Sequence, residues 1–152
     1  MIYQVNMKFN TPTSTALYSI EETIKAYRKL SQKNISSVIP DITVDQALIL
    51  IVISQSDKSQ SEIADLVFKD YASMTRIVSL MISKDYLLKT IDKGDKRKTK
   101  LTITEKGRDV IKKLKPMIDK NRETALANIS EEELQQMYNT LRKITTNCQL
   151  NK

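Results

Sequence analysis

The fold of this chain is decided by residues 59–107, which read SQSEIADLVFKDYASMTRIVSLMISKDYLLKTIDKGDKRKTKLTITEKG. Ser59 and Glu62 have the spacing of a capping box, in which two side chains satisfy free N–H groups at the start of a helix. Asp70 can cap a second helix a few residues later, because its carboxylate accepts bonds from backbone N–H groups. The stretch therefore predicts two successive helices with the spacing of a helix-turn-helix.

Both helices are amphipathic. The first is expected to bury Ile63, Ala64, Leu66 and Val67. In the second, one apolar stripe is formed at helical spacing by Met74, Ile77, Val78, Met81 and Ile82. The opposite face carries short polar side chains around one arginine, a set that can contact base edges or phosphates in a major groove. An ordinary amphipathic surface helix would show the same pattern, so this helix alone does not establish that the chain binds DNA. The candidate DNA-binding residues on the two helices are Ser59, Gln60, Ser61, Ala72, Ser73, Thr75, Arg76 and Ser79.

A cationic hairpin is expected after the second helix. Residues 86–92 and 98–103 have the composition of strands, and Gly94 and Asp95 between them favour a turn. Five cations fall within eight residues, namely Lys93, Lys96, Arg97, Lys98 and Lys100. A hairpin that is merely soluble does not need this much charge, and phosphates or a narrow minor groove are suitable partners. The first four of these cations complete the candidate DNA-binding set.

Four motifs in this stretch resemble the winged helix-turn-helix of MarR-type (multiple-antibiotic-resistance regulator) transcription factors. In chain order they are residues 59–64 (SQSEIA), 73–78 (SMTRIV), 95–97 (DKR) and 103–107 (ITEKG). The resemblance implies that Arg97 reaches the minor groove and that Asp95 braces the wing. The sequence departs from the family at Asp85, where members usually have a glycine at the end of the recognition helix. Aspartate tolerates left-handed backbone better than most residues, so the same fold is expected.

Two further segments precede this stretch. Residues 3–10 alternate between apolar and polar, which predicts a half-buried strand, with a loosely held terminus as the alternative. After a loop expected at 36–41, Thr43 and Gln46 form another capping box. The apolar run 47–53 is therefore expected to be a buried helix instead of a strand.

Long amphipathic helices flank the winged part. They are expected at 14–33, at 104–128 with a kink at Pro116, and from a capping box at Ser130 to the C-terminus, where Cys148 would fill a core or an interface. A small winged domain cannot cover their apolar stripes, whereas a second copy of the chain could. In the MarR family the terminal helices interlock in a twofold dimer. The expected organisation is one MarR-type domain, 1–152, with dimerisation helices at 14–33 and 108–150 and a DNA-binding part at 43–107.

Composition limits the classes of function. The 25 Lys and Arg outnumber the 18 Asp and Glu, giving a net charge of +7, and a basic band extends from Lys89 to Lys120. This band favours an anionic polymer over a membrane surface, because it lacks the Trp and Phe of interfacial helices. Zero His, two Gly and one Cys argue against His-based catalysis, a phosphate-binding loop and a multi-cysteine metal site. We expect no enzyme, no cofactor, no metal and no membrane partner. No secretory signal is visible in residues 1–10, so the expected location is the cytoplasm.

The combined prediction is a mainly α fold with a small β-hairpin wing, in a homodimeric repressor or activator that binds double-stranded DNA at an inverted repeat. Members of the family often bind small aromatic compounds, so the resemblance adds a small aromatic effector to the expected partners. Two other readings are a winged-helix module that binds protein and a redox-responsive regulator that uses Cys148. The second is weaker, because redox-sensing members of the family carry their cysteine near the N-terminus.

Overall fold

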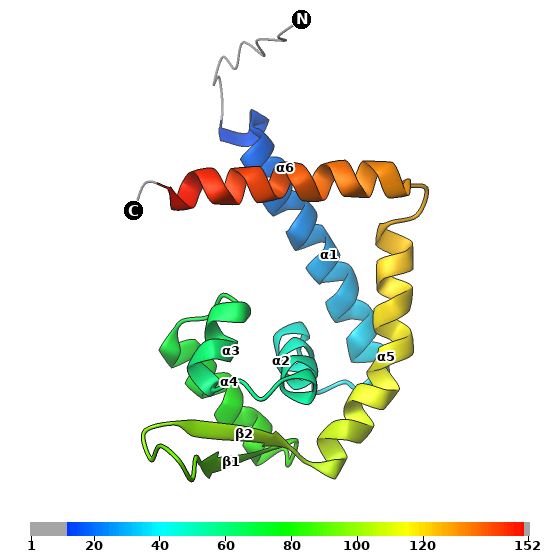
Figure 1. Ribbon diagram of the computed structural model, residues 1–152. Coiled ribbons are helices and arrows are strands. Elements are labelled where there is room, and N and C mark those ends of the chain that lie inside the picture. The colour runs from blue at the N-terminus through cyan, green and yellow to red at the C-terminus, as the bar shows by residue number, and fades with distance from the viewer. Residues whose placement is uncertain (1–11, 151–152) are drawn as a thin grey trace, which may run out of the picture. The chain divides into compact units, whose positions relative to one another are not determined.

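The computed structural model describes residues 12–150, which form six α-helices, one short 3-10 turn and a two-stranded hairpin (Figure 1). The elements are η1 (Pro12–Ser14), α1 (Ala16–Val38), α2 (Val44–Gln55), α3 (Gln60–Leu66), α4 (Tyr71–Ser83), β1 (Leu87–Ile91), β2 (Thr99–Ile103), α5 (Glu105–Ala125) and α6 (Glu131–Gln149). The predicted fold class, mainly α with a β-hairpin wing, is confirmed. The strand predicted at 3–10 lies outside the described residues. The described residues divide into two compact units, 12–121 and 122–150, and each unit is treated by itself.

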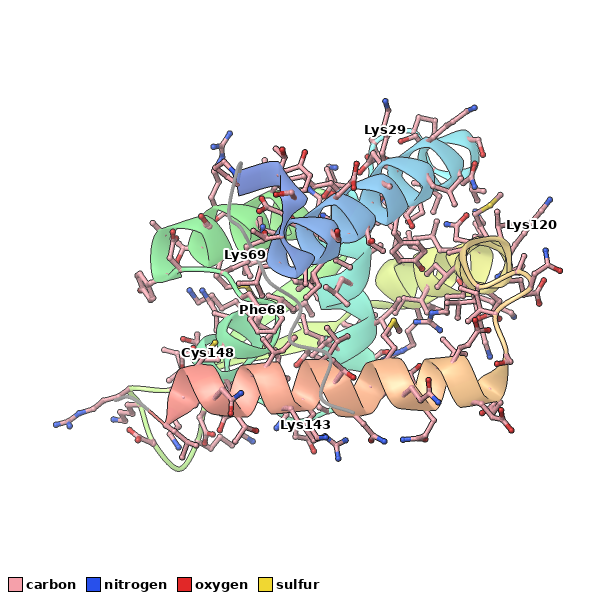
Figure 2. The ribbon with its side chains drawn as sticks, turned by 90° about the horizontal axis from the view of Figure 1, so that it is seen from above. Lys29, Phe68, Lys69, Lys120, Lys143 and Cys148 are labelled. Atoms are coloured by element: carbon pink, nitrogen blue, oxygen red, sulfur yellow. The ribbon has the colours of Figure 1, made fainter. Side chains whose placement is uncertain are left out.

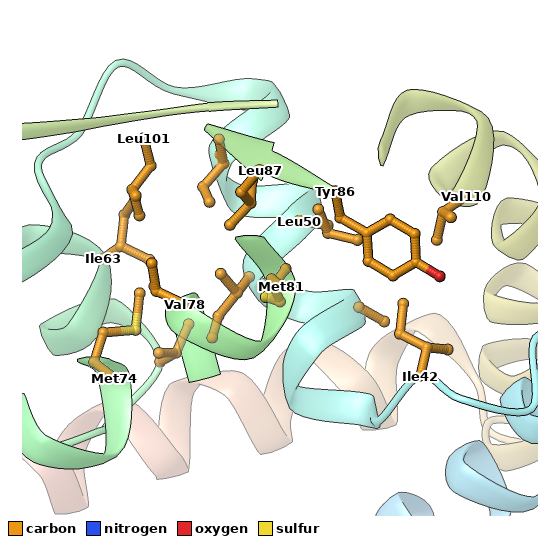
Figure 3. Close-up of a cluster of buried hydrophobic side chains, with 14 of the residues drawn as sticks. Ile42, Leu50, Ile63, Met74, Val78, Met81, Tyr86, Leu87, Leu101 and Val110 are labelled. Carbon is orange, nitrogen blue, oxygen red and sulfur yellow. The ribbon is translucent and has the colours of Figure 1, made fainter. Parts of the chain in front are cut away.

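The core of the first unit is built around the apolar stripe of α4. Met74, Val78 and Met81 are buried, and Ile77 and Ile82 lie half-buried beside them, as the spacing predicts. Around them in Figure 3 lie side chains of α2, α3 and the hairpin, including Leu50, Ile63, Leu87 and Leu101, and Val110 of α5 lies beyond Tyr86 in the same cluster. Burying each such side chain contributes about 1.5–3 kcal/mol. The same core therefore holds the helix-turn-helix and the hairpin together.

Side-chain caps determine where the helices begin. The capping boxes predicted at Thr43, Ser59 and Ser130 are all present. In each, the cap oxygen accepts the N–H of the third helical residue, whose Gln or Glu side chain accepts the N–H of the cap. Asp70 Oδ1 accepts the N–H of the third residue of α4 at 2.7 Å, and Thr104 Oγ1 accepts the Gly107 N–H at 3.0 Å. These predicted caps are confirmed, and each satisfies N–H groups that have no partner within the helix.

Helices α3 and α4 end in the same hydrogen-bonding pattern. In both, the N–H of the third residue past the helix end donates to a carbonyl five residues earlier, at 2.9 Å. This Schellman motif requires a left-handed residue, for which glycine is the usual choice. Here Phe68 and Asp85 take the position, with φ of 56° and 63°. Asp85 therefore adopts the geometry expected of the family's glycine. Phe68 lies beside Lys69 in the turn between α3 and α4 (Figure 2).

The end of α1 was predicted wrongly. The helix continues to Val38, so the loop expected at 36–41 is shortened from its start. Its last turns are held by Ile35, which is buried in the core, a tertiary contact that helix propensity does not include. Ile39 then adopts an extended conformation, because the proline that follows disfavours helical backbone at the preceding residue.

Two other predictions need correction. Leu66 was expected to be buried but is 50% exposed, because Ile63, Ala64 and Val67 define the inward face of α3 and Leu66 falls outside it. Helix α5 continues through Pro116 but ends at Ala125 instead of near residue 128. The chain then turns, and Asn128 adopts a left-handed φ of 64°.

The start of α5 lies very close to the segment that joins α4 to the hairpin. A Cβ on Gly107 would lie 2.3 Å from the Tyr86 carbonyl oxygen and 2.8 Å from Ile103 Cγ1. Thr104 strengthens the junction, since its hydroxyl donates to the Asp85 carbonyl at 2.7 Å. Only glycine fits at position 107 without moving backbone atoms.

We expect Gly107→Ala to lower the free energy of unfolding by about 1–3 kcal/mol, the usual cost of overpacking. Helix propensity alone would predict that Gly107→Ala raises the free energy of unfolding, because alanine is the better helix former. The measurement is urea unfolding followed by circular dichroism. Gly94→Ala is the matched control, since its Cβ would meet only Asp92 Oδ1 at 3.4 Å. Equal stability of wild type and Gly107→Ala would contradict the steric account.

A half-buried ion network connects α1, α2 and the turn before α4. Asp45 at the start of α2 accepts from Arg28 Nη2 at 2.5 Å, and its second carboxylate oxygen lies 2.9 Å from Lys69 Nζ. Burial by itself would raise the pKa of Asp45. The hydrogen bonds and charges of Arg28 and Lys69 together outweigh burial and hold the pKa below its ordinary value.

We expect Asp45→Asn to destabilise the protein by about 1 kcal/mol at pH 7, because two partly exposed ion pairs are lost. The folded-state pKa lies below the unfolded value of about 3.9, so the contribution of Asp45 is present above that value and disappears as the pH falls through the folded pKa. Urea unfolding at pH 7 and below pH 3.5 should therefore show that the difference in unfolding free energy between wild type and Asp45→Asn becomes smaller in acid. Asp65→Asn, at an exposed carboxylate of α3, is the control. A difference between wild type and Asp45→Asn that does not change with pH would contradict this account.

Candidate nucleic-acid interface

Helix α4 exposes a polar row opposite its buried stripe. Ala72, Arg76 and Ser79 follow one another at helical spacing and are exposed, while Ser73 and Thr75 lie half-buried at the edges of the row. The Asp70 carboxylate fixes the start of this helix. Its hydrogen bond with the Ser73 N–H is the main reason that the pKa of Asp70 lies below its ordinary value. The exposed row is thin and carries one cation, as the sequence predicts.

The start of α3 only partly agrees with the predicted contact set. Ser61 is exposed, and Ser59 is half-buried with its hydroxyl accepting the Glu62 N–H. Gln60 was expected on the contact surface but is only 8% exposed. Its Nε2 donates to Thr75 Oγ1 at 3.4 Å. The sequence held a signal for this burial, because Gln60 precedes Ile63 by three residues and so shares the inward face of α3.

The hairpin forms a wing whose tip is closed by backbone and aspartate contacts. Strands β1 and β2 pair in antiparallel register from Leu87 with Ile103 to Ile91 with Thr99. In the tip, the Asp95 carbonyl accepts the Lys98 N–H at 2.9 Å, and Asp95 Oδ1 accepts the Arg97 N–H at 3.0 Å. Asp95 thus folds the backbone on either side of Arg97. That geometry suits the bracing role that the family resemblance implies.

The cations of the wing are all exposed. Residues 89–100 contain six cations against two carboxylates, the cations being Lys89, Lys93, Lys96, Arg97, Lys98 and Lys100. Lys100 Nζ lies 3.4 Å from Asp57 Oδ1, and an isolated bridge pairs Ser59 with Lys100. The start of α3 is therefore attached directly to the wing.

One surface hollow of about 190 Å³ has all three segments on its border. It is lined by Ser59, Gln60, Ser61 and Ala64 of the α3 segment, Tyr71 and Met74 of α4, and Lys89, Arg97, Lys98 and Thr99 of the wing. Five of the predicted site residues therefore meet around one hollow. The others, on the outer row of α4 and at the wing tip, are not part of its lining.

Five lining residues of the hollow are absent from the predicted set, among them Tyr71 and Lys89. Tyr71 is the first residue of α4 and is largely exposed. Its position directly after the Asp70 cap is the signal that could have identified it. Lys89 belongs to the basic band, but whether its side chain lies toward the hollow depends on the register of the hairpin.

No three His, Cys, Asp or Glu side chains among residues 12–150 lie together in a way that could hold a metal ion. In the same range, no helix has the length and apolar character needed to cross a membrane.

Apolar side chains remain exposed on both predicted dimerisation segments. In α1 of the first unit, Leu17 is 62% exposed and Ile24 is also exposed. In α6 of the second unit, Met137 is 44% exposed, and Tyr138 and Cys148 are exposed too. Cys148, which lies near the end of α6 (Figure 2), therefore fills no core in the single chain.

No protein-family model matches the sequence. Solved structures with similar folds include S. aureus MepR in a DNA complex, at 19% identity and a TM-score of 0.79, with 88% of this chain and 98% of that chain covered. They also include a mutant of MarR from E. coli complexed with operator DNA, at 19% identity and a TM-score of 0.75, covering 83% and 90%. A third is Bordetella bronchiseptica BpsR, at 17% identity and a TM-score of 0.77, covering 89% and 96%. The chain therefore has the winged helix-turn-helix fold of MarR-type transcriptional regulators.

Proposed function

We propose that this chain is a sequence-specific DNA-binding transcriptional regulator that acts as a homodimer on an inverted-repeat operator. The observation that carries the proposal is the common hollow, around which the starts of α3 and α4 meet the cationic wing. The surface combines short polar groups, which suit base edges, with a concentration of exposed cations, which suits phosphates.

Each part of this surface has a distinct role in the proposal. Helix α4 enters the major groove, where its exposed row, including Arg76 and Ser79, contacts bases. The wing follows the backbone into the minor groove, where Arg97 lies at the tip and Lys93 and Lys96 bind phosphates. The DNA complexes of MepR and E. coli MarR, which have similar folds, support this assignment.

The homodimer is proposed from the exposed apolar side chains of α1 and α6. Leu17 on α1 and Met137 on α6 are large apolar side chains that are exposed in the single chain, and such exposed apolar side chains indicate an interaction surface where they cluster. A twofold dimer would bury both sets and present two copies of α4 to successive turns of the duplex. It would also bury the face near Cys148.

A small aromatic effector that changes DNA binding is the further part of this proposal. The DNA binding of BpsR is regulated by 6-hydroxynicotinic acid, and PcaV from Streptomyces coelicolor has been solved with its natural ligand. Both proteins have folds similar to this chain. Regulation of transcription would also place the chain in the cytoplasm, with the DNA.

The other two readings have less support. A protein-binding module would favour an apolar contact surface depleted in lysine, whereas the wing is rich in exposed lysine. A redox-responsive regulator that uses Cys148 is less favoured, because redox-sensing members of the MarR family carry their cysteine near the N-terminus, whereas Cys148 lies near the end of α6.

The proposed function is tested by selecting DNA from a pool of randomised duplexes with the full-length protein. We expect the enriched sequences to be inverted repeats whose half-site centres lie about 10 bp apart, one helical turn. Inserting roughly half a turn between the half-sites should abolish tight binding, because the two α4 helices would then face different sides of the duplex. Absence of enrichment, or affinity unchanged by the insertion, would refute the proposal.

The proposed division between helix and wing predicts different defects for two arginine variants. Arg97→Ala should weaken binding to operator and random DNA alike and reduce the salt slope by about one unit, as a lost phosphate-like contact does. Arg76→Ala should reduce the difference in binding free energy between operator and random DNA by about 1–3 kcal/mol, because a base contact is lost. Fluorescence anisotropy at several salt concentrations measures both.

Lys29→Ala is the matched control for these variants, because it removes an exposed cation from α1, outside the proposed surface. It should leave both affinities nearly unchanged. Parallel losses in the two arginine variants would overturn the division of roles. Unchanged binding in both would remove this surface from the DNA interface.

A further inference from the structure

Gln60 is a buried amide whose hydrogen bonding is incomplete. Its side chain is 8% exposed and packs on the same face of α3 as Ile63 and Ala64. Nε2 donates to Thr75 Oγ1 at 3.4 Å, while Oε1 is buried and has no hydrogen-bond partner among the described residues. A buried acceptor without a partner destabilises a fold. An apolar side chain of similar length would fill this place with less loss of stability, so packing alone does not account for the glutamine.

The Thr75 hydroxyl is paired with a side chain of another helix instead of with the backbone of its own. Thr23, Thr140 and Thr145 each donate their hydroxyl hydrogen to the carbonyl four residues earlier, at 2.8–3.0 Å. Thr75 makes no such bond; within the part of the chain that the structure describes, its hydroxyl is paired with Gln60 alone.

The donor in this pair determines which hydrogen-bonding role the Thr75 hydroxyl favours toward its other neighbours. A hydroxyl group has one hydrogen to donate and two lone pairs that accept. The Gln60 amide N–H occupies one lone pair of Thr75 from inside the protein, so the hydroxyl hydrogen is free to point outward. A threonine without such a neighbour can serve as donor or acceptor, whereas Thr75 is biased towards donating.

We propose that Gln60 is a specificity-determining residue that acts through Thr75, making its hydroxyl a hydrogen-bond donor toward the major groove. This rests on the proposed function, in which α4 contacts bases. A donor at this position selects base edges that present acceptors, such as guanine N7 and O6 or thymine O4, and disfavours the cytosine N4 amino group. Gln60 is a positioning residue in this account, since it does not touch DNA itself.

The test compares wild type, Gln60→Met and Thr75→Val on a selected operator and on duplexes that change one base pair of each half-site at a time. Wild type should prefer an acceptor-presenting base by roughly fivefold or more at one position, and Thr75→Val should abolish that preference. Gln60→Met keeps the length of the side chain but removes the amide. It should reduce the preference at that position to about twofold or less and leave the other positions unchanged.

Two further variants sharpen the result. In the Thr75→Val background, Gln60→Met should have no additional effect, because the hydroxyl that it orients is gone. Gln60→Glu places a carboxylate behind Thr75, which can only accept when ionised. The Thr75 hydroxyl would then donate inward and present its oxygen to DNA, so the preference should move toward cytosine. Circular dichroism shows whether each variant is folded, and Gln60→Leu replaces Gln60→Met if the latter is not.

The outcomes separate this inference from the proposed function. Wild-type protein that selects no DNA sequence would overturn both. A selected operator whose preferences are unchanged by Gln60→Met, or reduced equally at every position, would overturn the inference alone. An additive effect of Gln60→Met and Thr75→Val, or no change in preference on Thr75→Val, would do the same.

Discussion

The burial of one stripe on α4 is the constraint on which the rest of the structure depends. Met74, Val78 and Met81 can be removed from water only if α2, α3 and the hairpin cover them together, because a single helix or hairpin is too small to do so. That requirement orients α4 with its polar row outward. The surface proposed to contact DNA is thus the reverse side of the core, and substitutions in either one affect the other.

The junction between α4, the hairpin and α5 transmits this constraint to the wing. The left-handed Asp85 ends α4, its carbonyl accepts the Thr104 hydroxyl, and the Tyr86 carbonyl lies against Gly107. Because these contacts involve backbone atoms on both sides, they leave little freedom for the hairpin to rotate relative to α4. The base of the wing is consequently anchored to the end of α4, the helix that carries the polar row.

Gln60 and Asp45 illustrate how polar groups are used inside this unit. Asp45 has two cationic partners, and their charges offset the cost of its partial burial. Gln60 has one weak bond, and its side-chain oxygen has no partner among residues 12–150, so burying that oxygen costs stability. Incompletely satisfied polar groups in a natural core are expected at functional positions, where stability is given up for chemistry. The position of Gln60 behind the polar row of α4 agrees with that expectation.

The sequence by itself determined the features that depend on neighbouring residues. Capping at Ser59, Asp70 and Thr104 and the stripe of α4 were predictable, because caps and helical stripes involve residues only three or four positions apart. The cationic turn of the wing was predictable for the same reason. Tertiary structure alone decided the features that join distant segments. Ile35 extends α1 through a core contact, Asp45 of α2 pairs with Lys69 of the turn before α4, and the register of the hairpin brings Lys89 to the hollow. Gln60 lies between these cases: its spacing from Ile63 indicated burial, but only the packing of α3 against α4 placed it behind Thr75, because that contact joins residues 15 positions apart.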